Sequence, residues 1–206
     1  GTSNLRLGVN AGNSITSGGN FNVTVGDEAG TAITTGDGNV AIGYQAGDAL
    51  TTGIRNIAIG KTALGAATTS DYNTAVGYEA MGLNTTGTRN TALGVQALYT
   101  NVDGDNSVAI GYEALFNQDP ASNVDMYNVA VGYAAGKAVT TGINNTLIGG
   151  LAGDALTTGN LTAVGYSAGG SATTSVGNVF MGELAGASVT TGANNTAIGS
   201  QALSTE

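Results

Sequence analysis

A unit of about 17 residues recurs twelve times between Asn4 and Leu203, and this periodicity constrains the fold more than any other feature. Each unit is anchored by a glycine that follows an aliphatic residue or methionine. Nine of the eleven intervals between these anchors are 17 or 18 residues long, and the other two are 21 and 16. Such a chain folds as a stack of similar units that contact mainly their neighbours. The anchor glycines are Gly8, Gly26, Gly43, Gly60, Gly77, Gly94, Gly111, Gly132, Gly149, Gly165, Gly182 and Gly199.

The segment before each anchor alternates branched and small residues, as in residues 39–43 (Asn-Val-Ala-Ile-Gly). A period of two is typical of a β-strand. An alanine stands three residues after every anchor, and we expect a second short strand after it, ending in Thr-Thr-Gly at residues 34–36, 51–53 and 140–142. The sequence therefore predicts an all-β solenoid, or β-roll, of about twelve 17-residue coils, which forms a single repeat domain over residues 1–206.

Two positions within the repeat compensate each other in volume. Where the residue four after the anchor is glycine, as at Gly30, the residue seven after it is large, as at Ile33. Where the first position is large, as at Leu64, the second holds a smaller or polar residue, as at Ala67. We infer that both positions reach one core slot with room for one large side chain. The unit with Gly169 and Ala172 supplies neither.

Asparagine stands four residues before the anchor in ten of the twelve units, and near Asn106 and Asn160 it stands one place earlier. This pattern predicts a ladder of side-chain amides from coil to coil. The anchor glycine indicates a positive φ or a close backbone approach.

The middle residue of the predicted strand is alanine in eight units, and we expect it to face outward. A flat, small and apolar face is typical of a surface that contacts another chain. Each coil also offers few apolar side chains against the entropy of ordering about 17 residues. We therefore predict a parallel homotrimer whose chains meet on this alanine file, although a face that is simply exposed remains an alternative. The alanine file is Ala41, Ala58, Ala75, Ala92, Ala109, Ala130, Ala163 and Ala197.

The repeats at residues 195–203, 90–98 and 39–47 (Asn-Thr-Ala-Ile-Gly-Ser-Gln-Ala-Leu in the first) resemble those of phage tail-fibre-like proteins. Val-Ala-Ile-Gly at residues 108–111, followed by Ala114, is similar to the head repeat of trimeric autotransporter adhesins. Both resemblances imply a trimeric β-roll on an extracellular or virion fibre that contacts a host surface. The adhesin head repeat is usually shorter than this one.

Composition argues against several functional classes. The chain has no His and no Cys, so it lacks the commonest catalytic bases and nucleophiles. Glu28, Glu79 and Glu113 recur two residues after anchors but in non-adjacent coils, and Asp103-Gly104-Asp105-Asn106 is more typical of an ordinary turn than of a calcium site. The net charge of −9 disfavours nucleic acid, and no apolar run is long enough to span a membrane. We expect no enzyme, cofactor or metal site.

The remaining candidates are surface contacts. Tyrosine follows the anchor at Tyr44, Tyr78, Tyr112, Tyr133 and Tyr166, where the rings could stack on sugars or cover the edge of the roll. The 21-residue unit carries an insertion at about 116–127 that contains the one proline, and insertions in repeats are often contact loops. Its candidate contact residues are Phe116, Pro120 and Tyr127.

The sequence thus predicts a structural fibre segment of an extracellular or virion appendage that supports host-surface attachment through a glycan or protein receptor. The alternatives are a self-assembling extracellular filament subunit and, less favoured, an ice-binding protein with an outward threonine file. Because the repeats run nearly to both ends without a cap, we also expect a piece of a longer array or a unit that stacks end to end.

Overall fold

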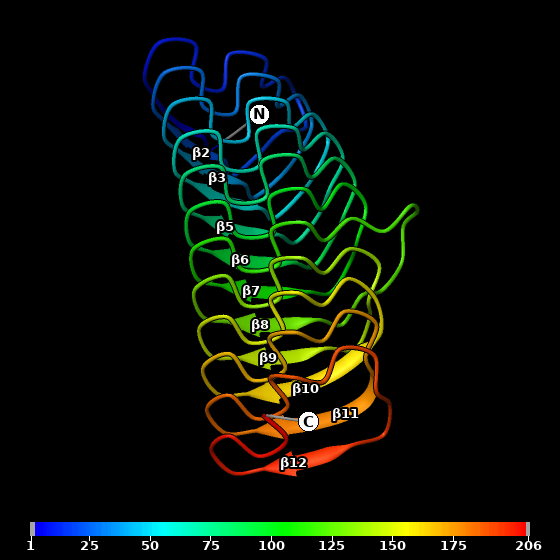
Figure 1. The fold of residues 1–206 in the computed structure, drawn as a ribbon. Helices are drawn as coiled ribbons and strands as arrows, with labels where there is room; N and C mark the ends of the chain where they lie inside the picture. Colours follow the sequence, from blue (N-terminus) through cyan, green and yellow to red (C-terminus); the bar gives the residue numbers. More distant parts are fainter. Residues whose placement is uncertain (1–2, 205–206) are drawn as a thin grey trace.

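Residues 3–204 form one continuous stack of coils in the computed structural model, which describes this part of the chain (Figure 1). Each coil contributes one short strand, and the strands make a single parallel sheet in which the order along the chain is also the order in space. The all-β solenoid is confirmed, with twelve strands and about eleven turns of chain. The strands are β1 (Leu5–Leu7), β2 (Val23–Val25), β3 (Val40–Ile42), β4 (Ile57–Ile59), β5 (Thr74–Val76), β6 (Thr91–Leu93), β7 (Val108–Ile110), β8 (Val129–Val131), β9 (Thr146–Ile148), β10 (Asn160–Val164), β11 (Val176–Met181) and β12 (Thr196–Ile198).

Equivalent residues of successive coils pair with each other along the whole sheet. Val40 pairs with Ile57, and Ile57 in turn pairs with Thr74. The backbone hydrogen bonds continue beyond the strands, since the amide of Gly43 donates to the carbonyl oxygen of Val25 at 2.8 Å. These bonds run along the axis of the stack, so each coil is held by the two coils beside it.

The segment after each anchor glycine folds into tight turns, so the prediction of a second strand there was wrong for the described residues. In the third coil, residues 44–49 are turn and Thr51 and Thr52 form a bend. The residues two and four after the anchor have left-handed φ in all twelve coils, and here they are Gln45 at 53° and Gly47 at 54°. Left-handed residues cannot continue an extended strand. The next turn closes where the amide of Leu50 donates to the carbonyl of Gly47 at 3.2 Å.

The anchor glycines serve both roles that the sequence suggested. Their φ values lie between 122° and 140°, a region that is almost exclusive to glycine. A β-carbon on Gly43 would lie 2.7 Å from the carbonyl oxygen of Gly60, and one on Gly111 would lie 2.3 Å from that of Gly132. No side chain fits between coils that stack this closely.

The alanine file points into the coil, which corrects the expectation that it faces outward. In β5 the middle residue Ala75 is fully buried while both flanking residues are half-buried. The opposite wall explains this, because a β-carbon on Gly47 would lie 3.8 Å from the β-carbons of both Ala41 and Ala58. A coil this thin has room for a small residue on the strand when the facing wall carries a large one. The buried set is Ala41, Ala58, Ala75, Ala92, Ala109, Ala130, Ala163 and Ala197.

The shared core slot is confirmed. A β-carbon on Gly30 would lie 2.8 Å from Cδ1 of Ile33, so the two positions compete for one space. The unit that supplies neither large residue is completed by its neighbour. Phe180, at the middle of β11, is fully buried, and its Cδ2 atom would lie 3.0 Å from a β-carbon on Gly169. The strand centre is therefore a third position that fills the slot.

The asparagine file forms the predicted ladder. The backbone amide of Asn39 donates to Oδ1 of Asn22 at 2.8 Å, and Nδ2 of Asn39 donates to the carbonyl oxygen of Gly53 at 2.8 Å. These side chains are buried, so the ladder satisfies polar groups that would otherwise be costly to bury. The same two bonds recur at Asn56, Asn73 and Asn90.

The ladder is interrupted before the insertion, where Ser107 takes the asparagine position. Gln118 repairs the interruption from inside the core: its Nε2 donates to Oδ1 of Asn101 at 3.0 Å, and its Oε1 accepts from Nδ2 of Asn128 at 2.8 Å. Residues 121–123 then project from the stack as the exposed tip of a loop (Figure 1, green), while the amide of Asp119 still bonds to Thr140 and Asp125 is bridged to Asp105. The projection is thus shorter than the predicted 116–127.

The ladder is interrupted again in the 16-residue unit. Leu161 occupies the asparagine position, and its backbone amide donates to Oδ1 of Asn145 at 2.7 Å. The pairing of β10 with β11 shifts register between Asn160 and Leu161. The missing residue therefore changes the sheet itself and leaves the side chain of Asn160 exposed.

Candidate functional site

The alanine file cannot be an interface between chains, because its side chains are inside the coil. The outward residues of the strands take its place as the apolar surface. The residue just before each anchor is aliphatic or methionine in all twelve coils, and we call these residues the outer aliphatic file. Several are exposed even within the stack, such as Leu93, with 47% of its surface exposed, and Met181, with 41%. The file is Leu7, Val25, Ile42, Ile59, Val76, Leu93, Ile110, Val131, Ile148, Val164, Met181 and Ile198.

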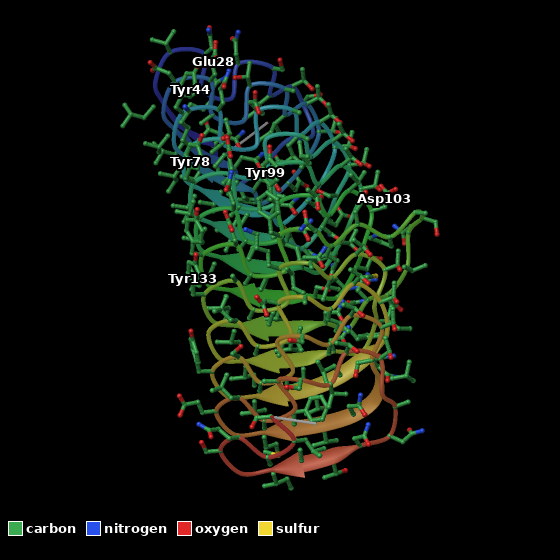
Figure 2. The ribbon with its side chains drawn as sticks, in the orientation of Figure 1. Glu28, Tyr44, Tyr78, Tyr99, Asp103 and Tyr133 are labelled. Carbon is green, nitrogen blue, oxygen red and sulfur yellow. The ribbon has the colours of Figure 1, made fainter. Side chains whose placement is uncertain are left out.

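The tyrosine file runs beside the outer aliphatic file, along one edge of the stack. Figure 2 shows Tyr44, Tyr78 and Tyr133 on this edge, with Asp103 on the opposite side. All five rings are exposed, between 41% for Tyr78 and 59% for Tyr133. One adjacent pair, Tyr112 and Tyr133, stacks with centroids 5.5 Å apart and planes at 11°. The file is Tyr44, Tyr78, Tyr112, Tyr133 and Tyr166.

Charged groups accompany the stacked tyrosines. Nζ of Lys137 lies 2.5 Å from Oε2 of Glu113, and this contact lowers the pKa of the Glu113 carboxyl and raises the pKa of the Lys137 ammonium. The hydroxyl of Tyr112 bonds to the same carboxylate, and this bond raises the pKa of the Tyr112 hydroxyl. Lys61 in turn lies over the ring of Tyr78, 5.6 Å from its centroid. These contacts hold the rings in place and leave them neutral.

The three candidate residues of the insertion do not form one patch. Phe116 stays in the stack and packs on Tyr99, with centroids 5.2 Å apart. Pro120 is buried, whereas Tyr127 is exposed and donates its hydroxyl proton to Oδ2 of Asp125 at 2.9 Å. Tyr127 alone is placed where a ligand could reach it.

Asp125 ties the returning limb of the loop to the stack. Its carboxylate accepts from Nδ2 of Asn106 and lies 4.0 Å from the guanidinium of Arg89. The same guanidinium lies 3.4 Å from Oδ2 of Asp105. These contacts explain why the chain re-enters the coil in register after a long excursion.

The other acidic residues that the sequence singled out accept hydrogen bonds from neighbouring coils. Oε2 of Glu28 accepts from Nε2 of Gln45 at 2.7 Å, and Oε2 of Glu79 accepts from Nε2 of Gln96 at 2.8 Å. Oδ1 of Asp103 accepts from the hydroxyl of Thr86 at 2.6 Å. Within residues 3–204, no three His, Cys, Asp or Glu side chains gather closely enough to hold a metal ion.

The threonine pairs divide their roles, as expected. The first hydroxyl bonds along the stack, since Oγ1 of Thr51 donates to the carbonyl of Thr68 at 2.9 Å, while the second residue, Thr52, is exposed. Each pair thus gives one outward threonine, and together they form a single file. The described part of the chain contains no helix long and apolar enough to cross a membrane.

A shallow hollow of about 190 Å³ lies beside β10 and β11, and sequence reasoning did not identify it. It opens where the unit is one residue short and where Gly177 replaces the larger residues found at this position in most other coils. The 16-residue interval was the available signal. The hollow is lined by Asn144, Asn160, Leu161, Thr162, Gly177, Asn178 and Val179.

Comparison of the chain with protein-family models, with curated proteins and with solved structures finds no match in any of the three.

Proposed function

We propose that this chain is a rigid structural segment of an extracellular or virion fibre, built from parallel copies of itself and supporting attachment to a host surface. The outer aliphatic file is the observation that carries the proposal. It places one apolar side chain per coil at the strand spacing of about 4.8 Å, along the whole sheet. The repeats that resemble tail-fibre and adhesin sequences support the same conclusion.

A second copy of the chain fits this face better than another partner does. The file is periodic and free of charged residues, so a parallel neighbour presents the same apolar row at the same heights. The surface of a globular partner would not repeat with the period of the coils along the whole length of the stack. Covering the row also removes from water the aliphatic surface that a lone coil leaves exposed.

The oligomeric state of the native chain tests this proposal. Sedimentation equilibrium and light scattering are expected to give a trimer, and electron micrographs short rods of uniform length. Replacing Val76 and Ile110 with glutamate places charges on the seam and is expected to yield folded monomers, as judged by circular dichroism.

The matched control places the same charges on the outward threonine file, as Thr52→Glu and Thr158→Glu, and is expected to leave the trimer intact. A wild-type monomer would contradict the proposal. Long polymers with no discrete rod would favour the rival function, a self-assembling filament subunit.

A further inference from the structure

We infer that the hollow beside β10 and β11 is a binding subsite for one uncharged sugar residue of a glycan. The inference rests on the proposed role in surface attachment and names a ligand class for it. The hollow lies at the start of its strands, whereas the outer aliphatic file lies at their ends, with Val164 and Met181 as the nearest members. The hollow therefore borders the seam, two residues before it on the same outward face of β10 and β11.

One of the positions that line the hollow lacks a side chain. The residue five before each anchor has left-handed φ in most coils and projects outward, as Asn144 does at 59° and Asn194 at 58°. In the eleventh coil this residue is Gly177, with φ 70°. A β-carbon on Gly177 would lie 2.6 Å from Oδ1 of Asn194, so a side chain added there would displace the end of the Asn194 side chain. The other glycine of this file, Gly38, does not line the hollow.

The walls carry hydrogen-bonding groups that the fold leaves unused. No hydrogen bond joins the side-chain amide of Asn144, or the hydroxyl of Thr162, to another residue in the range 3–204. Asn160 uses Oδ1 to accept from the amide of Gly177 at 2.6 Å, which leaves its Nδ2 protons available. A primary amide offers donors and acceptors side by side, which matches the adjacent hydroxyls of a sugar. Val179 adds an aliphatic wall for the C–H face of the ring.

The charge and size of the hollow narrow the range of sugars that it could bind. The residues that line the hollow are all uncharged, and the chain has a net charge of −9, so sialic and uronic acids would meet no cation and a repulsive field. The volume of about 190 Å³ is below the range of roughly 300–1,000 Å³ that drug-sized ligands occupy. One sugar residue of a longer glycan fits this volume. Tyr127 stands in the same file one coil before Asn144, at the edge of the hollow, and is exposed, so the next sugar of the glycan can stack on its ring.

The test measures glycan binding by the whole 206-residue chain. An array of immobilised oligosaccharides that end in glucose, galactose, mannose, N-acetylglucosamine or sialic acid identifies the ligand, and saturation-transfer NMR with the matching free sugar locates it. We expect binding to one or more neutral termini and none to sialic acid.

Two variants localise the effect. Gly177→Asn fills the hollow with a residue that the same file accepts at Asn144 and Asn194, and it is expected to reduce binding at least ten-fold. Asn144→Ala removes one unused amide and should reduce binding several-fold. The control Gly38→Asn makes the same change at the other glycine of the file and should bind as the wild type does.

Binding that is unchanged in Gly177→Asn, binding to sialylated termini alone, or no neutral binding by the wild type would each overturn the inference. Sedimentation of every variant separates this result from the proposed function. A trimer that binds no sugar refutes the subsite alone, and a monomer that binds sugar refutes the fibre alone.

Discussion

The long coil that follows Gly111 and the short coil that follows Gly149 depart from the repeat in opposite ways. Four extra residues in the long coil leave the stack as a loop, and the sheet continues unchanged, with Val108 paired to Val129. One missing residue in the short coil has a wider effect: β10 and β11 lengthen and their register shifts. Extra residues can project into solvent without disturbing the stack. When a residue is missing, the remaining residues of the coil must change their conformation to close it.

The two coils also repair the asparagine ladder differently. The long coil uses polar groups, with Gln118 bridging Asn101 and Asn128 inside the core. The short coil places the apolar Leu161 in the ladder, and its backbone amide bonds to Asn145. In the coil that follows, Phe180 fills the slot beside Gly169. The loss of one asparagine from a buried hydrogen-bonded ladder is tolerated when each polar group next to the gap finds another partner or is replaced by an apolar group.

The largest effect is expected where the two coils are alike. Gly111→Ala and Gly149→Ala would each place a β-carbon within 2.4 Å of the next anchor's carbonyl oxygen, at φ near 134°. Each should lower the free energy of unfolding by more than about 3 kcal/mol, or prevent folding. Chemical denaturation monitored by circular dichroism measures this. A clearly milder effect at Gly149 would mean that the irregular sheet relaxes around the short coil.

The apolar repair beside the short coil is expected to be the next most sensitive. Phe180→Ala opens a cavity in the slot and should cost about 3–5 kcal/mol. Adding Gly169→Leu should recover at least half of this loss, because leucine occupies the same position with a similar φ at Leu64 and Leu115. The control Gly153→Leu, in the preceding coil, should recover nothing, because the nearest atoms to a β-carbon there belong to Leu147 and Leu161 and not to Phe180.

The anchoring of the loop in the long coil should matter less. Asp125→Ala removes the contacts to Asn106, Tyr127 and Arg89, and is expected to cost about 1–2 kcal/mol. Limited proteolysis should then cut the loop faster. Deleting residues 121–123 from the exposed tip should change stability by less than about 1 kcal/mol, and a larger loss would show that the tip itself supports the stack.

The smallest expected effect depends on pH and concerns the short coil. Burial raises the pKa of the Asp154 carboxyl above its ordinary value of 3.8, so the ionised form is less stable in the fold than in the unfolded chain. This group stabilises the fold below its ordinary pKa, and that contribution is lost as pH rises through the folded-state pKa. Asp154→Asn should therefore raise Tm at pH 7 by about 1–2 °C, because solvent screens a half-buried carboxylate.

The gain from Asp154→Asn should disappear below about pH 3, where the wild-type carboxyl is protonated too. The long coil carries Phe116 at the equivalent position and gives no such pH dependence. Calorimetry from pH 3 to pH 8 distinguishes these cases. A loss of stability at neutral pH would show that the backbone bonds accepted by this carboxylate outweigh its burial.

Much of this fold could be predicted because the repeat samples each structural rule twelve times. Gly43 and Asn39 are explained by local rules, a forbidden φ and a buried amide, which act the same way in any coil. The shared slot was visible because Gly30 and Ile33 vary together with their counterparts in other coils. Repetition converts weak single-site signals into strong ones.

The orientation of the strand could not be predicted in the same way. A period of two defines two faces, and residue size suggested that the larger Val40 and Ile42 face inward and Ala41 outward. The opposite holds, because the space within one thin coil is set by the far wall, which a single chain's alternation does not reveal. The left-handed φ at Gln45 was equally hidden, since its residue type varies from coil to coil. The hollow was missed for another reason: it lies beside the register shift between Asn160 and Leu161, which the 16-residue interval signals but does not locate.

The direction of the hydrogen bonds has a mechanical consequence. These bonds lie along the axis of the stack. Tension applied between the two ends would therefore break the bonds of one coil at a time instead of breaking those of many coils together. Each coil that opens would release about 17 residues, or roughly 55–60 Å of extended chain. Under tension, a solenoid of this kind would unfold in equal steps and dissipate mechanical work. A fibre made from it would therefore absorb sudden pulls before it broke.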